Sequence, residues 1–243
     1  RATLRSPFFV FKIINREKLD CCRFGVKFAT INNLSMKQAY NLKPTDSHWW
    51  GEPVLQEGID LPFTVEEYAD GTQEQFPMSL VCQINCADFI QCNPCNHLVK
   101  MLPGEGLISF FANVDYFLGD MEASGEGMGE WSANSFRVLY SPDMDRLCTH
   151  KIVDEEGRDC AIPAEPLCVP QDEGEESRVL SQPTCFVDDV EAYYPGYVTL
   201  LQLDGSDRHG LRFYDDGCLF FFISPDDLLA KKFDKAECAM FSM

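Results

Sequence analysis

The sequence predicts an α+β fold of mainly antiparallel sheets with short helices, arranged as two pseudo-repeated subdomains. Apolar runs of strand length recur along the chain, with turn-forming residues between them. A Gly-x-x-x-Phe-Phe pattern begins at Gly106 and again at Gly217, and each copy follows an apolar run that ends in Gln-apolar-Asn or Gln-apolar-Asp. Because consecutive strands are joined by turns, the sheets should be antiparallel. The repeat is too long for a solenoid, so it indicates two related halves.

The N-terminal segment, residues 1–45, is predicted to be a strand and a helix packed on the body of the protein. The run FFVFKII has the apolar character of a strand. The run SMKQAYNL suits one or two helical turns capped by Ser35.

The first half is predicted over residues 46–153. Residues 43–77 are rich in proline, glycine and acidic residues, so we expect a long ordered connection there and no strand layer. The elements expected after it are a strand at 79–85, a short helix from Cys86 that breaks at Pro94, a strand at 107–114, a surface loop at 117–131 and a strand at 135–141.

An acidic segment, residues 154–176, is predicted to separate the halves. It contains nine acidic residues and one arginine, together with several prolines, which is typical of a solvated loop. The second half is predicted over residues 177–243 and should begin its sheet with a strand at 196–204.

The run RFYDDGCLFFFI predicts a β-hairpin. Its apolar parts, 211–214 and 218–223, have strand length and are separated by Asp215, Asp216 and Gly217. An Asp-Gly pair between such runs is a strong signal for a turn in which both residues take positive φ.

The run SPDDLLAKKF predicts a helix with matched ends. Ser224 suits the N-cap position and Pro225 the first helical position. Asp226 and Asp227 would face the positive end of the helix dipole, and the two lysines that follow would lie in the last turn. The aspartates of this region therefore have structural roles, and a catalytic carboxylate cluster is not needed to explain them.

The charge of the chain limits its partners. The 39 acidic and 20 basic residues give a formal net charge of −19. The electrostatic field of so acidic a chain repels nucleic acids and anionic membranes, and it favours a basic protein partner. We therefore expect neither nucleic-acid nor membrane binding.

The cysteines and the apolar runs bear on localisation. The chain has 12 cysteines among 243 residues, which is below the roughly 8–10 % found in disulfide scaffolds. Most of them lie within apolar runs, where a cysteine behaves as a small hydrophobe. No run approaches the roughly 18–20 apolar residues of a membrane span. We expect a cytoplasmic protein.

The run CADFIQCNPCNH is the strongest candidate for metal chemistry. Cys92 and Cys95 form a Cys-x-x-Cys pair, and His97 could add a nitrogen ligand. A structural zinc site needs a fourth ligand, which Cys148 or His150 could supply. Without a second Cys-x-x-Cys the two-knuckle signature is missing, so structural thiols and a redox pair remain alternatives. No cofactor is expected unless this group binds zinc.

Six further residues are candidates for binding. Trp49 and Trp50 could line a groove or pack under the connection. The other four stand at equivalent strand ends: Gln83 and Asn85 in the first half, and Gln202 and Asp204 in the second. They could satisfy backbone groups of turns or line a cleft between the halves.

Several motifs together resemble those of the YwqG-like family, a mostly bacterial domain family of unknown function. They are SHWWGEPVLQEGIDLP, SLVCQIN, LPGEGLISFF, FRVLYS, LLQLD and LRFYDDGCLFFFISPDDLLAKKF, in that order, and they cover residues 46–241. The sequence departs from the family pattern at Gln56, at Asp215 and in the CNPCNH insertion. The resemblance implies an α+β fold of two related subdomains and a cytoplasmic protein with no established reaction.

Two functions follow as hypotheses. The first is a non-enzymatic cytoplasmic binding protein that neutralises a basic partner, because the chain is strongly acidic and has no Gly-x-Ser-x-Gly elbow or phosphate-binding loop. The alternative is an enzyme or a metal-binding protein with its site in a cleft between the two halves.

Overall fold

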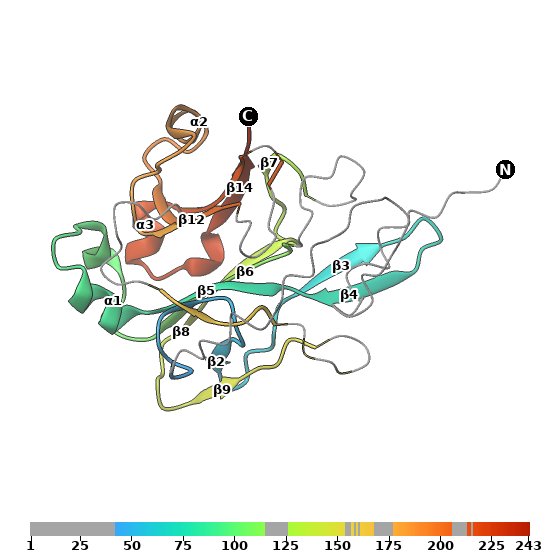
Figure 1. Cartoon of the computed structure of the whole chain (residues 1–243), viewed down its shortest axis with the longest axis horizontal. Helices are drawn as coiled ribbons and strands as arrows, with labels where there is room; N and C mark the ends of the chain where they lie inside the picture. Colours follow the sequence, from blue (N-terminus) through green and yellow to red (C-terminus); the bar gives the residue numbers. More distant parts are fainter. Residues whose placement is uncertain are drawn as a thin grey trace, which may run out of the picture.

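The structure is a computed structural model, shown in Figure 1. It describes residues 42–114, 126–153, 157, 159, 161–167, 177–205, 213–214 and 216–243. The strand and helix expected within residues 1–45 lie almost entirely outside the described residues.

Two five-stranded sheets dominate the part of the chain that the structure describes. All of their strand pairs are antiparallel. The first sheet has, in spatial order, β10 (Glu165–Pro166), β1 (His48–Trp49), β5 (Ser79–Asn85), β6 (Leu107–Ala112) and β8 (Phe136–Ser141). The second has β11 (Arg178–Val179), β12 (Val198–Asp204), β13 (Cys218–Ile223), β14 (Glu237–Phe241) and β7 (Gly129–Glu130).

Smaller elements surround these sheets. Two strand pairs are β2 (Val54–Gln56) with β9 (Leu147–Thr149), and β3 (Phe63–Glu67) with β4 (Gln73–Pro77). The helices are α1 (Cys86–Cys92), α2 (Val187–Tyr193) and α3 (Pro225–Leu229), with 3₁₀ turns η2 (Leu98–Met101) and η3 (Phe233–Lys235). The α+β class predicted from the sequence is confirmed.

Four strands of each sheet correspond, since β1, β5, β6 and β8 follow one another in space as β11, β12, β13 and β14 do. β5 pairs with β6 as β12 pairs with β13, and each pair is interrupted once. The interruption lies between Leu80 and Cys82 in the first sheet and between Thr199 and Leu201 in the second. Because a shift of this kind is a local feature of a strand, its recurrence at the matching position supports a repeat of one folding unit.

One apolar core joins the two sheets. It contains inward-facing residues from both β6 and β13, and the rings of Phe110 and Phe221 meet edge to face with centroids 5.4 Å apart. These phenylalanines are the matching positions of the Gly-x-x-x-Phe-Phe repeat. The space between the sheets is therefore filled with packed side chains from the described residues.

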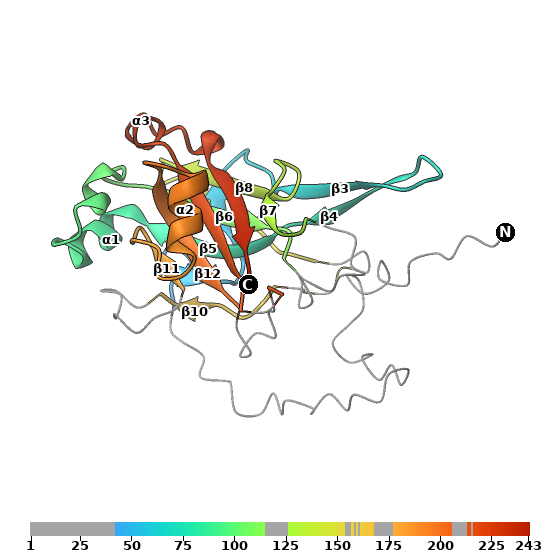
Figure 2. The same ribbon diagram turned by 90° about the horizontal axis from the view of Figure 1, so that it is seen from above.

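The outer faces of the sheets are also covered. On the first sheet Phe111 packs with Leu55 of β2. On the second, Phe220 and Phe222 pack with Val190 of α2, which lies over this sheet in Figure 2, and with Tyr194, the residue that follows this helix. Burial on both faces explains why β13 is a continuous apolar run and why β6 has Ser109 as its one polar residue.

The connection expected at 43–77 is wrong in part. Residues 63–77 form the hairpin β3–β4, and β1 and β2 lie before it. The Asp70-Gly71 turn, in which Gly71 has φ +82°, is the signal that the composition of the segment concealed. Part of the predicted acidic loop also differs, since β10 pairs with β1 and Leu167 is buried.

The hairpin predicted at 211–223 is wrong for residues 213 and 214 of its first strand, while residues 211, 212 and 215 lie outside the described residues. β13 pairs with β12, while Phe213 and Tyr214 are not in a strand. Asp216 has the expected positive φ of 51°, but Gly217 has no positive φ. Gly217 is needed for close approach, because a Cβ there would lie 2.2 Å from the carbonyl oxygen of Phe213.

Helix α3 has the predicted start and an earlier end. The Ser224 side chain accepts from the backbone N–H of Asp227 (3.1 Å), and Pro225 is the first helical residue. The lysines expected in the last turn lie just beyond the helix, which ends at Leu229. Among the described residues, no helix is long and apolar enough to cross a membrane.

Candidate functional site

Gln83 of β5 is fully buried and holds two loops of the first half. Its Oε1 accepts from the backbone N–H of Val54 (3.0 Å), and its Nε2 donates to the carbonyl of Pro44 (2.8 Å). The same amide nitrogen lies 3.2 Å from Nε2 of His48. Both amide protons and the oxygen thus have partners, as a buried amide requires.

Asn85 ends β5 and starts α1. Its Oδ1 accepts from the backbone N–H of Asp88 (3.3 Å), which caps the helix, and its Nδ2 donates to the carbonyl of Thr45 (3.1 Å). Its backbone N–H donates to Oγ of Ser47 (2.9 Å). Asn85 therefore serves the backbone at a strand end, as the turn alternative predicts.

Gln202 of β12 has the same role in the second half. Its Oε1 accepts from the backbone N–H of Thr184 (3.0 Å), and its Nε2 donates to Oγ1 of Thr184 (2.7 Å) and to Oδ2 of Asp204 (3.4 Å). The backbone N–H of Asp204 donates to Oγ of Ser177 (3.2 Å).

These bonds repeat between the halves residue by residue. The matching positions are Ser47 and Ser177, Val54 and Thr184, Gln83 and Gln202, and Asn85 and Asp204. Trp50 and Leu180 also match. Both have positive φ, 57° and 47°, and their N–H groups donate to the carbonyls of Val81 and Leu200, the residues at which the strand registers shift.

The two tryptophans differ in exposure. Trp50 is buried in the common core, and Trp49 is partly buried and packs against it. Gly51 follows with φ +94°, and a Cβ there would lie 2.8 Å from the Cβ of Ala164. This packing is what the structural alternative for Trp50 predicts.

His48 is buried, and its two hydrogen bonds are those of a neutral imidazole ring. Nδ1 lies 2.6 Å from the carbonyl oxygen of Trp50, so it must carry the proton, which leaves Nε2 to accept from Gln83. The pKa of His48 is lowered by burial, against the opposing effects of backbone carbonyls and Asp46. A protonated ring would place two donors against each other.

Cys92, Cys95 and His97 are all exposed, at the end of α1 and in the turn after it. α1 ends before Pro94, as predicted. Among the described residues these three do not form a group with ligand atoms close enough for one metal ion, nor does Cys148 or His150 complete one. The neighbouring Asn96 donates to the carbonyl of Leu180 (2.7 Å), which ties this turn to the second half.

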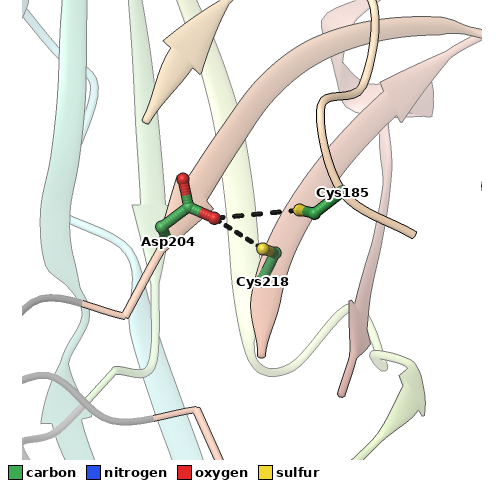
Figure 3. Close-up of side chains that lie close together, drawn as sticks. All are labelled: Cys185, Asp204 and Cys218. Atoms are coloured by element: carbon green, nitrogen blue, oxygen red, sulfur yellow. Dashed lines mark hydrogen bonds between the residues drawn. The ribbon is translucent and has the colours of Figure 1, made fainter. Parts of the chain in front are cut away.

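A different set of potential ligands is brought together on the outer side of the second sheet (Figure 3). Asp204 ends β12, Cys218 begins β13 opposite it, and Cys185 lies just before α2. Oδ1 of Asp204 is 2.5 Å from Sγ of Cys218 and 3.8 Å from Sγ of Cys185. All three ligand atoms lie within 4.8 Å of one another.

Sequence reasoning named Asp204 and missed the two cysteines. They are 33 positions apart and share no Cys-x-x-Cys spacing. The signal that could have found them is the repeat: Gln202 places Thr184, and Cys185 is the next residue, while Cys218 follows the repeat glycine Gly217.

Almost the whole described part of the chain is similar to one known protein family. The family model described as "Domain of unknown function (DUF1963)" matches residues 47–190 and 166–240. A search of curated proteins finds no match. The family match spans both sheets and both buried glutamines, and it extends over well more than half of the sequence. The chain belongs to this family, the domain of unknown function DUF1963.

Proposed function

We propose that the protein is a non-enzymatic cytoplasmic binding protein that recognises an arginine-rich segment of a basic protein partner. Its place among YwqG-like proteins is part of this proposal and is supported by the motifs of the two sheets. The described cysteines are free thiols, which supports a reducing compartment.

The observation that carries the proposal is an exposed acidic and aromatic surface on α2. We define this α2 surface as Val187, Asp188, Asp189, Glu191 and Tyr193, all of which are exposed. Tyr193 is 71 % exposed and stacks on Phe241 of β14, with ring centroids 6.0 Å apart. The ring is thus held in place while most of it faces solvent.

Arginine is the side chain that fits this surface best. Asp189 and Tyr193 are one helical turn apart, so they lie on the same side of α2. A guanidinium can stack on an aromatic ring and donate to a carboxylate at the same time, whereas a lysine ammonium makes only point contacts. The net charge of −19 would increase the rate of encounter with a cationic segment.

Fluorescence anisotropy of a labelled oligo-arginine peptide tests the proposal. We expect the full chain to bind it at low salt, more tightly than oligo-lysine, and to lose affinity as salt increases. Tyr193→Ala should weaken binding by about fivefold, which corresponds to roughly 1 kcal/mol. Asp188→Asn with Asp189→Asn should weaken it by a similar factor.

The matched control removes two charges elsewhere. Glu67 on the β3–β4 hairpin and Asp145 before β9 are both exposed. Glu67→Gln with Asp145→Asn changes the net charge equally and should leave affinity within about twofold. Equal weakening by the control, or no binding at low salt, would contradict the proposal.

A further inference from the structure

We propose that Cys185, Asp204 and Cys218 bind a zinc ion on the outer side of the second sheet. This site is independent of the α2 surface and is not the Cys-x-x-Cys group. Its three side chains come from three separate segments that the fold brings to one point (Figure 3).

The first half shows that the fold itself does not require these residues. The positions that match Cys185, Asp204 and Cys218 are Leu55, Asn85 and Leu107. Leu107 pairs with Asn85 as Cys218 pairs with Asp204, and both leucines are completely buried. The same ladder is thus built once with two leucines and an amide, and once with two thiols and a carboxylate.

The chemistry of the second set is that of a zinc site. Two thiolates and a carboxylate are ligands that Zn²⁺ accepts in tetrahedral geometry, with water in the fourth position. Ligand atoms around such an ion are about 3.3–3.8 Å apart, given bonds of about 2.0–2.3 Å. The present spacing, within 4.8 Å, requires only small side-chain rotations.

Neighbouring hydrogen bonds already hold the ligands in place. Nε2 of Gln202 donates to Oδ2 of Asp204, which leaves Oδ1 directed at the two sulfur atoms. The Oε1 of the same amide fixes the backbone N–H of Thr184, the residue before Cys185. Buried partners of this kind orient metal ligands and increase metal affinity.

Without metal, both thiols donate hydrogen bonds to the carboxylate of Asp204. The pKa of the Cys218 thiol is raised by the hydrogen bond with Cys185, by burial and by Asp204. Zinc binding would replace the two thiol protons, which pass to solvent, with one divalent cation.

Cobalt titration of the full chain under reducing conditions, followed by zinc competition, tests the site. We expect a thiolate-to-cobalt charge-transfer band that saturates at one equivalent and disappears when zinc is added. Cys185→Leu and Cys218→Leu, which install the residues of the first half, should abolish this band. Asp204→Asn should weaken cobalt binding at least about tenfold. Cys92→Ser with Cys95→Ser is the matched control and should leave the titration unchanged.

A second measurement uses the unaltered chain, so its outcome does not depend on whether the variants fold. Zinc should slow alkylation of the half-buried Cys185 at least about tenfold, while the exposed Cys148 reacts at the same rate with and without zinc. An unchanged alkylation rate of Cys185, or a cobalt band that survives both leucine variants, would overturn the proposal.

Discussion

Lys231 takes a left-handed backbone conformation directly after α3, with φ +58°. Its N–H donates to the carbonyl of Leu228 (3.0 Å), and the N–H of Lys232 donates to the carbonyl of Asp227 (2.8 Å). These two bonds form a Schellman motif, in which glycine is the preferred residue at the position of Lys231.

Replacing this lysine by glycine should stabilise the protein. We expect Lys231→Gly to increase the free energy of unfolding by about 0.5–1 kcal/mol, because relief of the left-handed strain exceeds the added entropy of the unfolded chain. Urea denaturation measures the change. Lys232→Gly, at φ −91°, is the control and should not stabilise the protein. A stabilisation shared by both variants would contradict the explanation.

His48 makes stability depend on pH. Its pKa is lower in the folded protein than in the unfolded chain, so the unfolded state binds the proton more readily. The contribution of neutral His48 is therefore complete above about pH 6.5 and is lost as the pH falls towards the folded-state pKa. We expect the loss of stability between about pH 7.5 and pH 5.5 to be smaller in His48→Gln than in the unaltered protein. An equal loss in both, measured by urea midpoints, would contradict this.

At the scale of elements, each half depends on one buried glutamine. Gln83→Leu would leave the backbone N–H of Val54 without its acceptor, and Gln202→Leu would do the same to Thr184. Each variant should lose about 1–3 kcal/mol of unfolding free energy. The exposed Gln182 provides the control, and Gln182→Leu should change stability by less than about 0.5 kcal/mol. A loss in only one half would contradict the equivalence of the two glutamines.

The elements that could be predicted from the sequence are those with a strong local signal. The long apolar runs predicted β5, β6, β12 and β13, the alternation in residues 135–141 predicted β8, and the Ser-Pro-Asp-Asp pattern predicted α3. β10 and β7 have two residues each, which is too short for any periodicity to appear. The Asp216-Gly217 pair predicted a tight hairpin, but β13 instead pairs with β12, which lies further back in the sequence.

The candidate sites, too, could be predicted only where their signal is local in the sequence. The four polar residues at the strand ends could be found because the Gln-apolar-Asn and Gln-apolar-Asp patterns that contain them are short and continuous in the sequence. The cluster of Cys185 with Cys218 could not, since it depends on how segments far apart in the chain pack on one sheet. Likewise, nothing local indicated that Cys92, Cys95 and His97 would all be exposed at the end of a short helix.

At the scale of the whole molecule, the two halves share one core, and the first half contributes an edge strand to the second sheet. β7, from the first half of the chain, adds to the second sheet beside β14. Cys82 of β5 and Cys238 of β14 are both fully buried in the common core, and burial raises the pKa of each thiol. A chain built in this way should unfold as one cooperative unit and not as two domains.

Alkylation of these two thiols in increasing urea, read by mass spectrometry after a short pulse, measures both halves in one experiment. Cys82 and Cys238 should become reactive at the same urea concentration, together with the loss of tryptophan fluorescence. Exposure of one thiol at clearly lower urea, while the other stays protected, would contradict a single core shared by both halves.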